Sequence, residues 1–261
     1  EDVLAGLDRL ASLYEAWITD CEAQGRLLPD AVLVAQAVKH VETARNAAAR
    51  IRGGIDLLRN DSVAMEAFRL ANRAIWLQDS WKKRRQNRTD GLVWRPFQLA
   101  FVLLTLNSAS DDRDPDRETM DLLWFPTGGG KTEAYLLLTA HVIFLRRLRA
   151  GGQPEGAGVT VFMRYTLRLL TIQQFQRAAA LVFACDLLRR GVEPCGAVSI
   201  PAHFAADEPI SIGLWVGGES VPNRVKEALD ALKKETEGQQ PPSSPRRLTR
   251  CPQCDAELKW A

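Results

Sequence analysis

The stretch Leu122–Tyr135, with the sequence LLWFPTGGGKTEAY, is the segment from which the fold and chemistry of this chain are best predicted. Its first four residues are apolar and typical of a buried strand, and an apolar helix is expected from Lys131 to Leu148. A strand, a glycine-rich loop and a helix in this order form the setting of a phosphate-binding, or Walker A, loop. Glycines let backbone N–H groups approach phosphate oxygens, and the helix directs its N-terminal dipole at the same anion.

Lys131 and Thr132 follow the glycines and are the candidate catalytic residues. In a phosphate-binding loop the lysine reaches the β- and γ-phosphates of ATP, and the neighbouring hydroxyl binds Mg²⁺. The strict motif requires glycine where the chain has Phe125, whereas the string PTGGGKT resembles motif I of superfamily 2 helicases and translocases. A glycine-rich turn that binds no ligand is the alternative interpretation.

A glutamine upstream of the loop is a second candidate for nucleotide binding. Gln98 lies in the string WRPFQ and precedes Lys131 by 33 residues (131 − 98). In superfamily 2 helicases an upstream glutamine reads the adenine edge, and its amide offers both the donor and the acceptor that adenine requires. The candidate nucleotide-binding residues are therefore Gln98, Thr127, Gly128, Gly129, Gly130, Lys131, Thr132 and Glu133.

Two further strands are expected after the loop helix. Val159–Met163 follows a Gly/Pro loop, and Ile210–Val216 ends in the pair Gly217-Gly218. Strand, helix and strand within about fifty residues fit a parallel crossover unit. The predicted fold class is α/β, with a RecA-like parallel sheet in residues 91–237 that is an incomplete first helicase domain.

The segment RYTLRLLTIQQ, residues 164–174, resembles motif Ia of the same helicases, which grips the nucleic-acid backbone. Arginine, threonine and helix N–H groups are suitable donors to phosphates. The candidate nucleic-acid-binding residues are Thr166, Arg168, Gln173, Gly217 and Gly218. The alternatives are a helix whose polar residues are merely exposed, and a plain turn at the glycine pair.

The two ends of the chain differ from this middle part. Residues 1–90 have a helical apolar period, with a break or kink expected at Gly53-Gly54 and an N-cap at Asp61, and predict an all-helical region. Such a region either packs on the rest or serves as a platform for a partner. Residues 238–261 predict a polar linker and half of a zinc-ribbon-like element, because Cys251 and Cys254 have the spacing of a Zn²⁺ knuckle. A redox-active cysteine pair is the alternative.

Composition limits the classes of function. The 34 basic and 32 acidic side chains give a net charge of only +2, so any contact with nucleic acid must be local. No apolar run approaches the roughly 18 residues that span a bilayer, so no membrane partner is expected. Five cysteines, an odd number, favour a reducing cytoplasm, and the absence of an initiator Met suggests a fragment.

Four strings together resemble the helicase subunits of DISARM anti-phage systems: FPTGGGKTEAY, MRYTLRLLTIQQFQRAA, GLWVGG and CPQC. The resemblance implies an ATP-dependent DNA helicase or translocase that uses Mg²⁺. It implies single-stranded DNA, or duplex DNA with an overhang, and a DrmB-type partner subunit. Motif II, the arginine finger and the second lobe are absent, so the chain alone is expected to be inactive. The alternatives are a P-loop ATPase or kinase without a nucleic-acid role, and a zinc-bearing scaffold with a vestigial loop.

Overall fold

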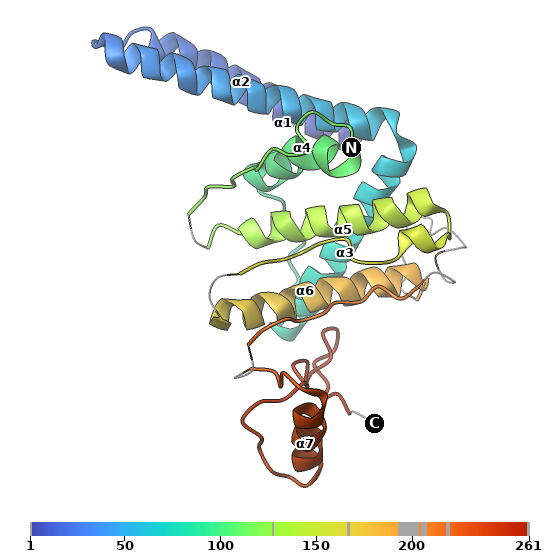
Figure 1. Ribbon diagram of the computed structural model, residues 1–261. Helices are drawn as coiled ribbons and strands as arrows, with labels where there is room; N and C mark the ends of the chain where they lie inside the picture. The colour runs from blue at the N-terminus through green and yellow to red at the C-terminus, as the bar shows by residue number, and fades with distance from the viewer. Residues whose placement is uncertain are drawn as a thin grey trace.

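The computed structural model describes residues 2–126, 128–165, 168–192, 204, 208–217 and 220–259, and the side chains of residues 168–170 are not described. The elements are α1 (Val3–Gly25), α2 (Ala31–Asn60), α3 (Ser62–Arg85), α4 (Pro96–Ser110), α5 (Lys131–Ala150), a 3₁₀ turn η1 (Pro154–Gly156), α6 (Arg168–Arg189) and α7 (Val225–Thr236). Figure 1 shows α3 crossing behind α5 and α6, which run side by side.

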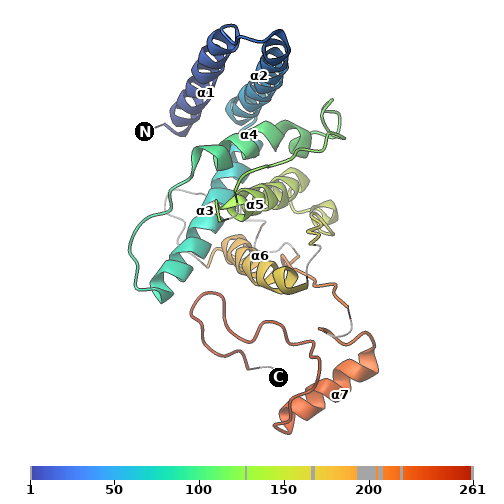
Figure 2. The same cartoon turned by 90° about the vertical axis from the view of Figure 1, so that its left-hand side faces the viewer.

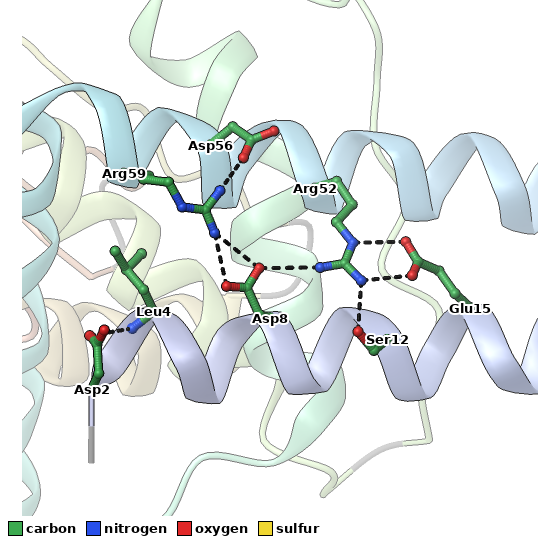
Figure 3. Close-up of polar contacts among 8 residues, drawn as sticks. All are labelled: Asp2, Leu4, Asp8, Ser12, Glu15, Arg52, Asp56 and Arg59. Atoms are coloured by element: carbon green, nitrogen blue, oxygen red, sulfur yellow. Dashed lines mark hydrogen bonds and ion pairs between the residues drawn. The ribbon is translucent and has the colours of Figure 1, made fainter.

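Helices α1 and α2 form a long antiparallel hairpin that projects from the rest (Figures 1 and 2). Two arginines of α2 join it to α1. Arg52 donates to Glu15 Oε1 and Oε2 at 2.8 and 2.7 Å, and Arg59 donates to Asp8 Oδ2 at 2.8 Å (Figure 3). Because these pairs are partly exposed, they fix the pairing of the helices more than they stabilise the fold.

Helix α2 passes through the glycine pair without interruption, so the break expected at Gly53-Gly54 is wrong. A Cβ atom on Gly54 would lie 2.0 Å from the carbonyl oxygen of Leu103 in α4. The glycine therefore permits close packing of α2 on α4, a tertiary reason that outweighs its low helix propensity.

Helix α3 is the central element of the core. Asp61 caps it by accepting hydrogen bonds from Val63 N at 2.9 Å and Ala64 N at 3.0 Å, as predicted. Ten of its residues are buried, and it packs against both α5 and α6. One apolar core includes residues of α1 to α6, so the first ninety residues share their interior with the glycine-loop part of the chain.

The predicted α/β fold with a RecA-like parallel sheet is wrong: the described residues contain no β-strand, and the isolated bridge between Arg250 and Glu257 is the β-pairing that they show. The three segments expected as strands run extended over the helices. Their inward side chains Leu123, Met163, Ile210 and Ile212 pack on the helical core. Their outward side chains Trp124, Phe162 and Trp215 are 86%, 85% and 99% exposed.

Side chains of the helices form hydrogen bonds with backbone groups of these segments and of the residues beside them. In a sheet, such groups would bond to a neighbouring strand. Arg146 Nη1 donates to Val159 O at 3.0 Å, and Arg147 Nη1 donates to Glu208 O at 2.6 Å. Asp186 Oδ1 accepts from Ile210 N at 3.1 Å. The apolar residues of these segments therefore indicate that some side chains are buried against helices. An isolated extended segment shows the same pattern as a strand in a sheet, so the pattern does not distinguish them.

Among the described residues, none of the helices has the length and apolar character needed to cross a bilayer.

Candidate nucleotide-binding site

The glycine loop lies at the N-terminus of α5, where the sequence predicts it. Gly130 is the N-cap residue, with φ of 90°, a left-handed conformation that favours glycine. It carries no side chain that could cap the helix, so the first N–H groups of α5 have no side-chain cap. Uncapped N–H groups and the positive end of the helix dipole make this position suited to an anion.

Lys131 folds back over the loop. Its Nζ donates to the carbonyl oxygen of Phe125 and, at 3.3 Å, to that of Pro126. The ammonium group is thus already at the loop, held by exposed carbonyl oxygens that a phosphate could replace as its partners. Thr132 follows in the first turn of α5, and Thr127 lies outside the described residues.

Two side chains at the start of α4, those of its N-cap residue Arg95 and of Gln98, hold the loop. Arg95 Nη1 donates to Gly129 O at 2.8 Å, and Gln98 Nε2 donates to Gly130 O at 2.7 Å. Gln98 Oε1 in turn accepts from Arg95 N at 2.8 Å, and Gln98 is only 5% exposed. Both ends of the Gln98 amide therefore bond to the protein itself, and a contact to adenine requires at least one of these bonds to be exchanged.

An aromatic pair closes the same side of the loop. The rings of Phe97 and Phe125 stack with centroids 3.9 Å apart and an interplanar angle of 11°. A Cβ atom on Gly129 would lie 2.4 Å from the Phe125 ring, so this glycine is required by packing. Phe125 is the residue that departs from the strict phosphate-loop motif, and here it contributes to the wall of the loop.

Glu133, in the first turn of α5, forms an ion pair with Arg177 of α6. Arg177 Nη2 donates to Glu133 Oε1. The second oxygen, Oε2, is buried and has no hydrogen-bond partner in the described part of the chain. It lies 3.2 Å from the position that a Cβ atom on Gly130 would occupy. Glu133 therefore reaches from the glycine loop to α6.

Tyr165 lies near this ion pair, at the end of the extended segment that leads towards α6. Burial raises the pKa of Tyr165, while the charge of Arg177 lowers it and Tyr135 raises it. Arg177 therefore lies close both to the first turn of α5 and to the extended segment that ends at Tyr165.

The candidate nucleic-acid residues that the structure describes lie at the same end of the molecule as the glycine loop. The N-termini of α5 and α6 and the end of segment 208–217 all point to the left in Figure 1, and this side faces the viewer in Figure 2. Arg168 is the first residue of α6, and Gln173 and Gly217 are exposed. Thr166 and Gly218 lie outside the described residues.

The two candidate zinc ligands lie in a tight hairpin. Cys251 N donates to Ala256 O at 2.8 Å, and Leu258 N donates to Thr249 O at 2.9 Å. Arg85 Nη1, at the end of α3, holds the turn through Pro252 O at 2.6 Å. Both thiols are free, and no group of three or more potential metal ligands occurs in the parts of the chain that are described.

The surroundings of Cys251 favour its thiolate. Partial burial raises the pKa of the Cys251 thiol, but the backbone N–H groups of Cys254 and Gln253, the Cys254 side chain and Arg85 outweigh it. The net pKa is lower than usual, which suits a soft metal ion.

Sequence reasoning missed Arg177. No local pattern could have found it, since it is separated from Glu133 by 44 positions and meets it only because α5 and α6 pack on the same helix.

No protein-family model matches the chain. The chain is similar to the DISARM protein DrmA of Bacillus paralicheniformis, with 37% identity over 240 residues. The alignment covers 86% of this chain and 20% of that protein, so the chain spans about a fifth of the length of this curated relative.

Proposed function

We propose that the chain is part of a DrmA-like component of a DISARM system that acts in anti-phage defence, and that it provides the nucleotide-binding part of an ATP-dependent DNA helicase or translocase. The similarity to DrmA supports the system, and the residues of the glycine loop support the activity. The loop that supports the activity begins α5 and is held by Arg95 and Gln98 at the start of α4.

The observation that carries the proposal is the pairing of an uncapped helix N-terminus with the folded-back Lys131. A polyphosphate needs donors and positive charge at one place, and this end of α5 offers both. The residues present therefore fit a nucleotide, with Gly128 and Gly130 supplying backbone N–H groups and Lys131 the charge. The Gly129 N–H donates to Pro126 O at 3.2 Å and would exchange this bond for a phosphate oxygen.

In the proposed mechanism Lys131 leaves the carbonyl oxygens of Phe125 and Pro126 and turns to the β- and γ-phosphates of ATP. There it stabilises the charge that develops on the transferred phosphoryl group. Thr132 is the residue that would hold Mg²⁺, which, when bound, neutralises phosphate charge. Gln98 and Arg95 keep the loop in place through their bonds to Gly130 O and Gly129 O, and adenine recognition is the alternative role for Gln98.

We assign the DNA contact to the end of the molecule where α5 and α6 begin. Arg168, Gln173 and Gly217, together with Thr166 and Gly218, would contact the backbone of single-stranded DNA or of a duplex with an overhang. A DrmB-type subunit is the proposed protein partner.

Calorimetric titration with ATP and Mg²⁺ tests the nucleotide site. We expect Lys131→Ala to weaken ATP binding at least tenfold, because the phosphate tail loses its cation. Lys226→Ala, which removes an exposed lysine from the unrelated helix α7, is the matched control and should bind as the wild type does. Equal affinities of Lys131→Ala and wild type would refute the nucleotide site.

A measurement of ATP hydrolysis with and without DNA, made on a DrmA-like protein that contains this chain, distinguishes the proposed function from the alternatives. Stimulation by DNA supports a helicase or translocase. Hydrolysis that DNA does not change supports an ATPase or kinase without a nucleic-acid role, and absence of nucleotide binding supports a scaffold with a vestigial loop.

A further inference from the structure

The ion pair between Glu133 and Arg177 joins two surfaces that the proposed function uses. Glu133 is the third residue of α5 and lies against the glycine loop through Oε2. Arg177 lies on α6, four residues after Gln173. Residues four apart on a helix occupy the same face, so Arg177 contacts Glu133 from the face of α6 that also carries Gln173.

The Glu133 and Arg177 side chains are both accessible enough to change partners when a charged ligand binds nearby. Their side chains are 32% and 38% exposed, so neither is locked in the core. The main chain of Arg177 is held to α3, since Gln78 Nε2 donates to Arg177 O at 2.7 Å. A change at Glu133 can therefore redirect the guanidinium while α6 stays in place.

Only one oxygen of the Glu133 carboxylate accepts a hydrogen bond among the described residues. Oε1 takes the Arg177 hydrogen bond, while Oε2 is buried beside Gly130 and has no partner among the described residues. A buried carboxylate oxygen without a partner is costly, so a donor or cation that arrives at the loop gains from binding there. Such a ligand competes with Arg177 for the same carboxylate.

We infer that Glu133 holds Arg177 away from DNA in the nucleotide-free protein and releases it when Mg²⁺ and ATP occupy the loop. The inference rests on the proposed function and adds a regulatory step to it. Once released, the Arg177 guanidinium adds a phosphate contact beside Gln173 and strengthens DNA binding. Because binding free energies are reciprocal, DNA must strengthen nucleotide binding by the same factor.

The first test needs no nucleotide. We measure the affinity for a fluorescent single-stranded oligonucleotide in wild type, Glu133→Gln and Arg177→Gln. Glu133→Gln removes the competing charge and should raise DNA affinity several-fold. Arg177→Gln should change it less than about twofold, because its charge is already neutralised by Glu133.

The second test adds a non-hydrolysable ATP analogue and Mg²⁺. Wild type should bind DNA several-fold more tightly than without nucleotide, Arg177→Gln should lose this gain, and Arg177→Lys should keep part of it because the charge remains. The matched control is Arg149→Gln, which removes a 3.1 Å ion pair with Asp61 at the opposite end of α5 and should leave the gain intact. Thermal midpoints of all variants separate lost coupling from lost folding.

The outcomes distinguish the inference from the function on which it rests. If wild type binds no nucleotide or no DNA, the proposed function fails. If it binds both, but Glu133→Gln does not raise DNA affinity or Arg177→Gln keeps the full gain, the inference is overturned and the function stands.

Discussion

Gln98 Nε2 in α4 donates a 2.7 Å hydrogen bond to the carbonyl oxygen of Gly130, which occupies the N-cap position of α5. The bond joins a buried side chain to the backbone of the glycine loop. It makes the position of the loop depend on the packing of α4, which lies against α2 and α5. The loop is therefore placed by the helical core.

Gln98→Ala should loosen the loop and weaken nucleotide binding. The Gly130 carbonyl and the Arg95 N–H lose their partner, at a cost of about 0.5–1.5 kcal/mol for each bond, because both bonds are only partly buried and water can replace them. Titrations with ATP and with GTP show which role Gln98 has. We expect both affinities to fall by a similar factor, because the amide bonds to the loop. A loss confined to ATP would instead support adenine recognition.

Gly130→Ala should destabilise the protein by about 1–2 kcal/mol, because an L-residue is strained in the left-handed region. Its Cβ would also lie 2.7 Å from Gln98 Nε2. Gly6→Ala in α1 is the control, since its Cβ meets nothing within 4 Å and alanine favours a helix interior, so this variant should gain roughly 0.5–1 kcal/mol. Urea unfolding measures both, and equal stability of Gly130→Ala and wild type would contradict the loop conformation.

His141 predicts a loss of stability in mild acid. Burial, and secondarily the charge of Arg149, lower its pKa to about 4, against a small opposing effect of Asp61. Between pH 6.5 and about 4 the unfolded chain therefore binds a proton that the folded chain does not, so stability falls as the pH is lowered through this window. For this fully buried ring the full effect is on the order of 3 kcal/mol.

Urea unfolding of wild type and His141→Gln at pH 7.5 and pH 5 measures this effect. The difference in free energy of unfolding between the two proteins should shrink as the pH falls. Only wild type has an imidazole that takes up a proton on unfolding in this pH range. A difference that is the same at both pH values would show that His141 titrates normally.

Cys251 and Cys254 are proposed to supply two of the four ligands of a structural Zn²⁺. The hairpin presents two neighbouring thiols, and the lowered pKa of Cys251 favours the thiolate that a metal requires. Protein purified with zinc should carry metal by elemental analysis, and Cys251→Ser with Cys254→Ser should lose it. Cys21→Ser, in α1, is the control. Zinc content that the double variant keeps would place the metal elsewhere, and a redox pair would instead form a disulfide in the absence of metal.

The sequence predicted the local elements of the site better than the fold. The helix after Lys131 and the cap at Asp61 are confirmed, because each depends on neighbouring residues. The parallel sheet failed at Leu122–Phe125, Val159–Met163 and Ile210–Val216. Each segment packs some of its apolar side chains inward, but these contact helices and not neighbouring strands.

Contacts distant in sequence account for what could not be predicted. The bonds from Arg95 and Gln98 to the loop, and from Arg177 to Glu133, join positions 34, 32 and 44 residues apart. Nothing in the pattern of α6 marks Arg177 as the partner of Glu133, since that pairing arises from the way both helices pack on α3.

Amide hydrogen exchange of the peptide that spans residues 126–136 tests the central claim most directly. With ATP and Mg²⁺, we expect the backbone N–H groups from Gly128 to Thr132 to exchange more slowly, because they donate to phosphate oxygens. Lys131→Ala should abolish most of this protection. Exchange that is unchanged in this peptide, while ATP slows exchange in another part of the chain, would contradict the account.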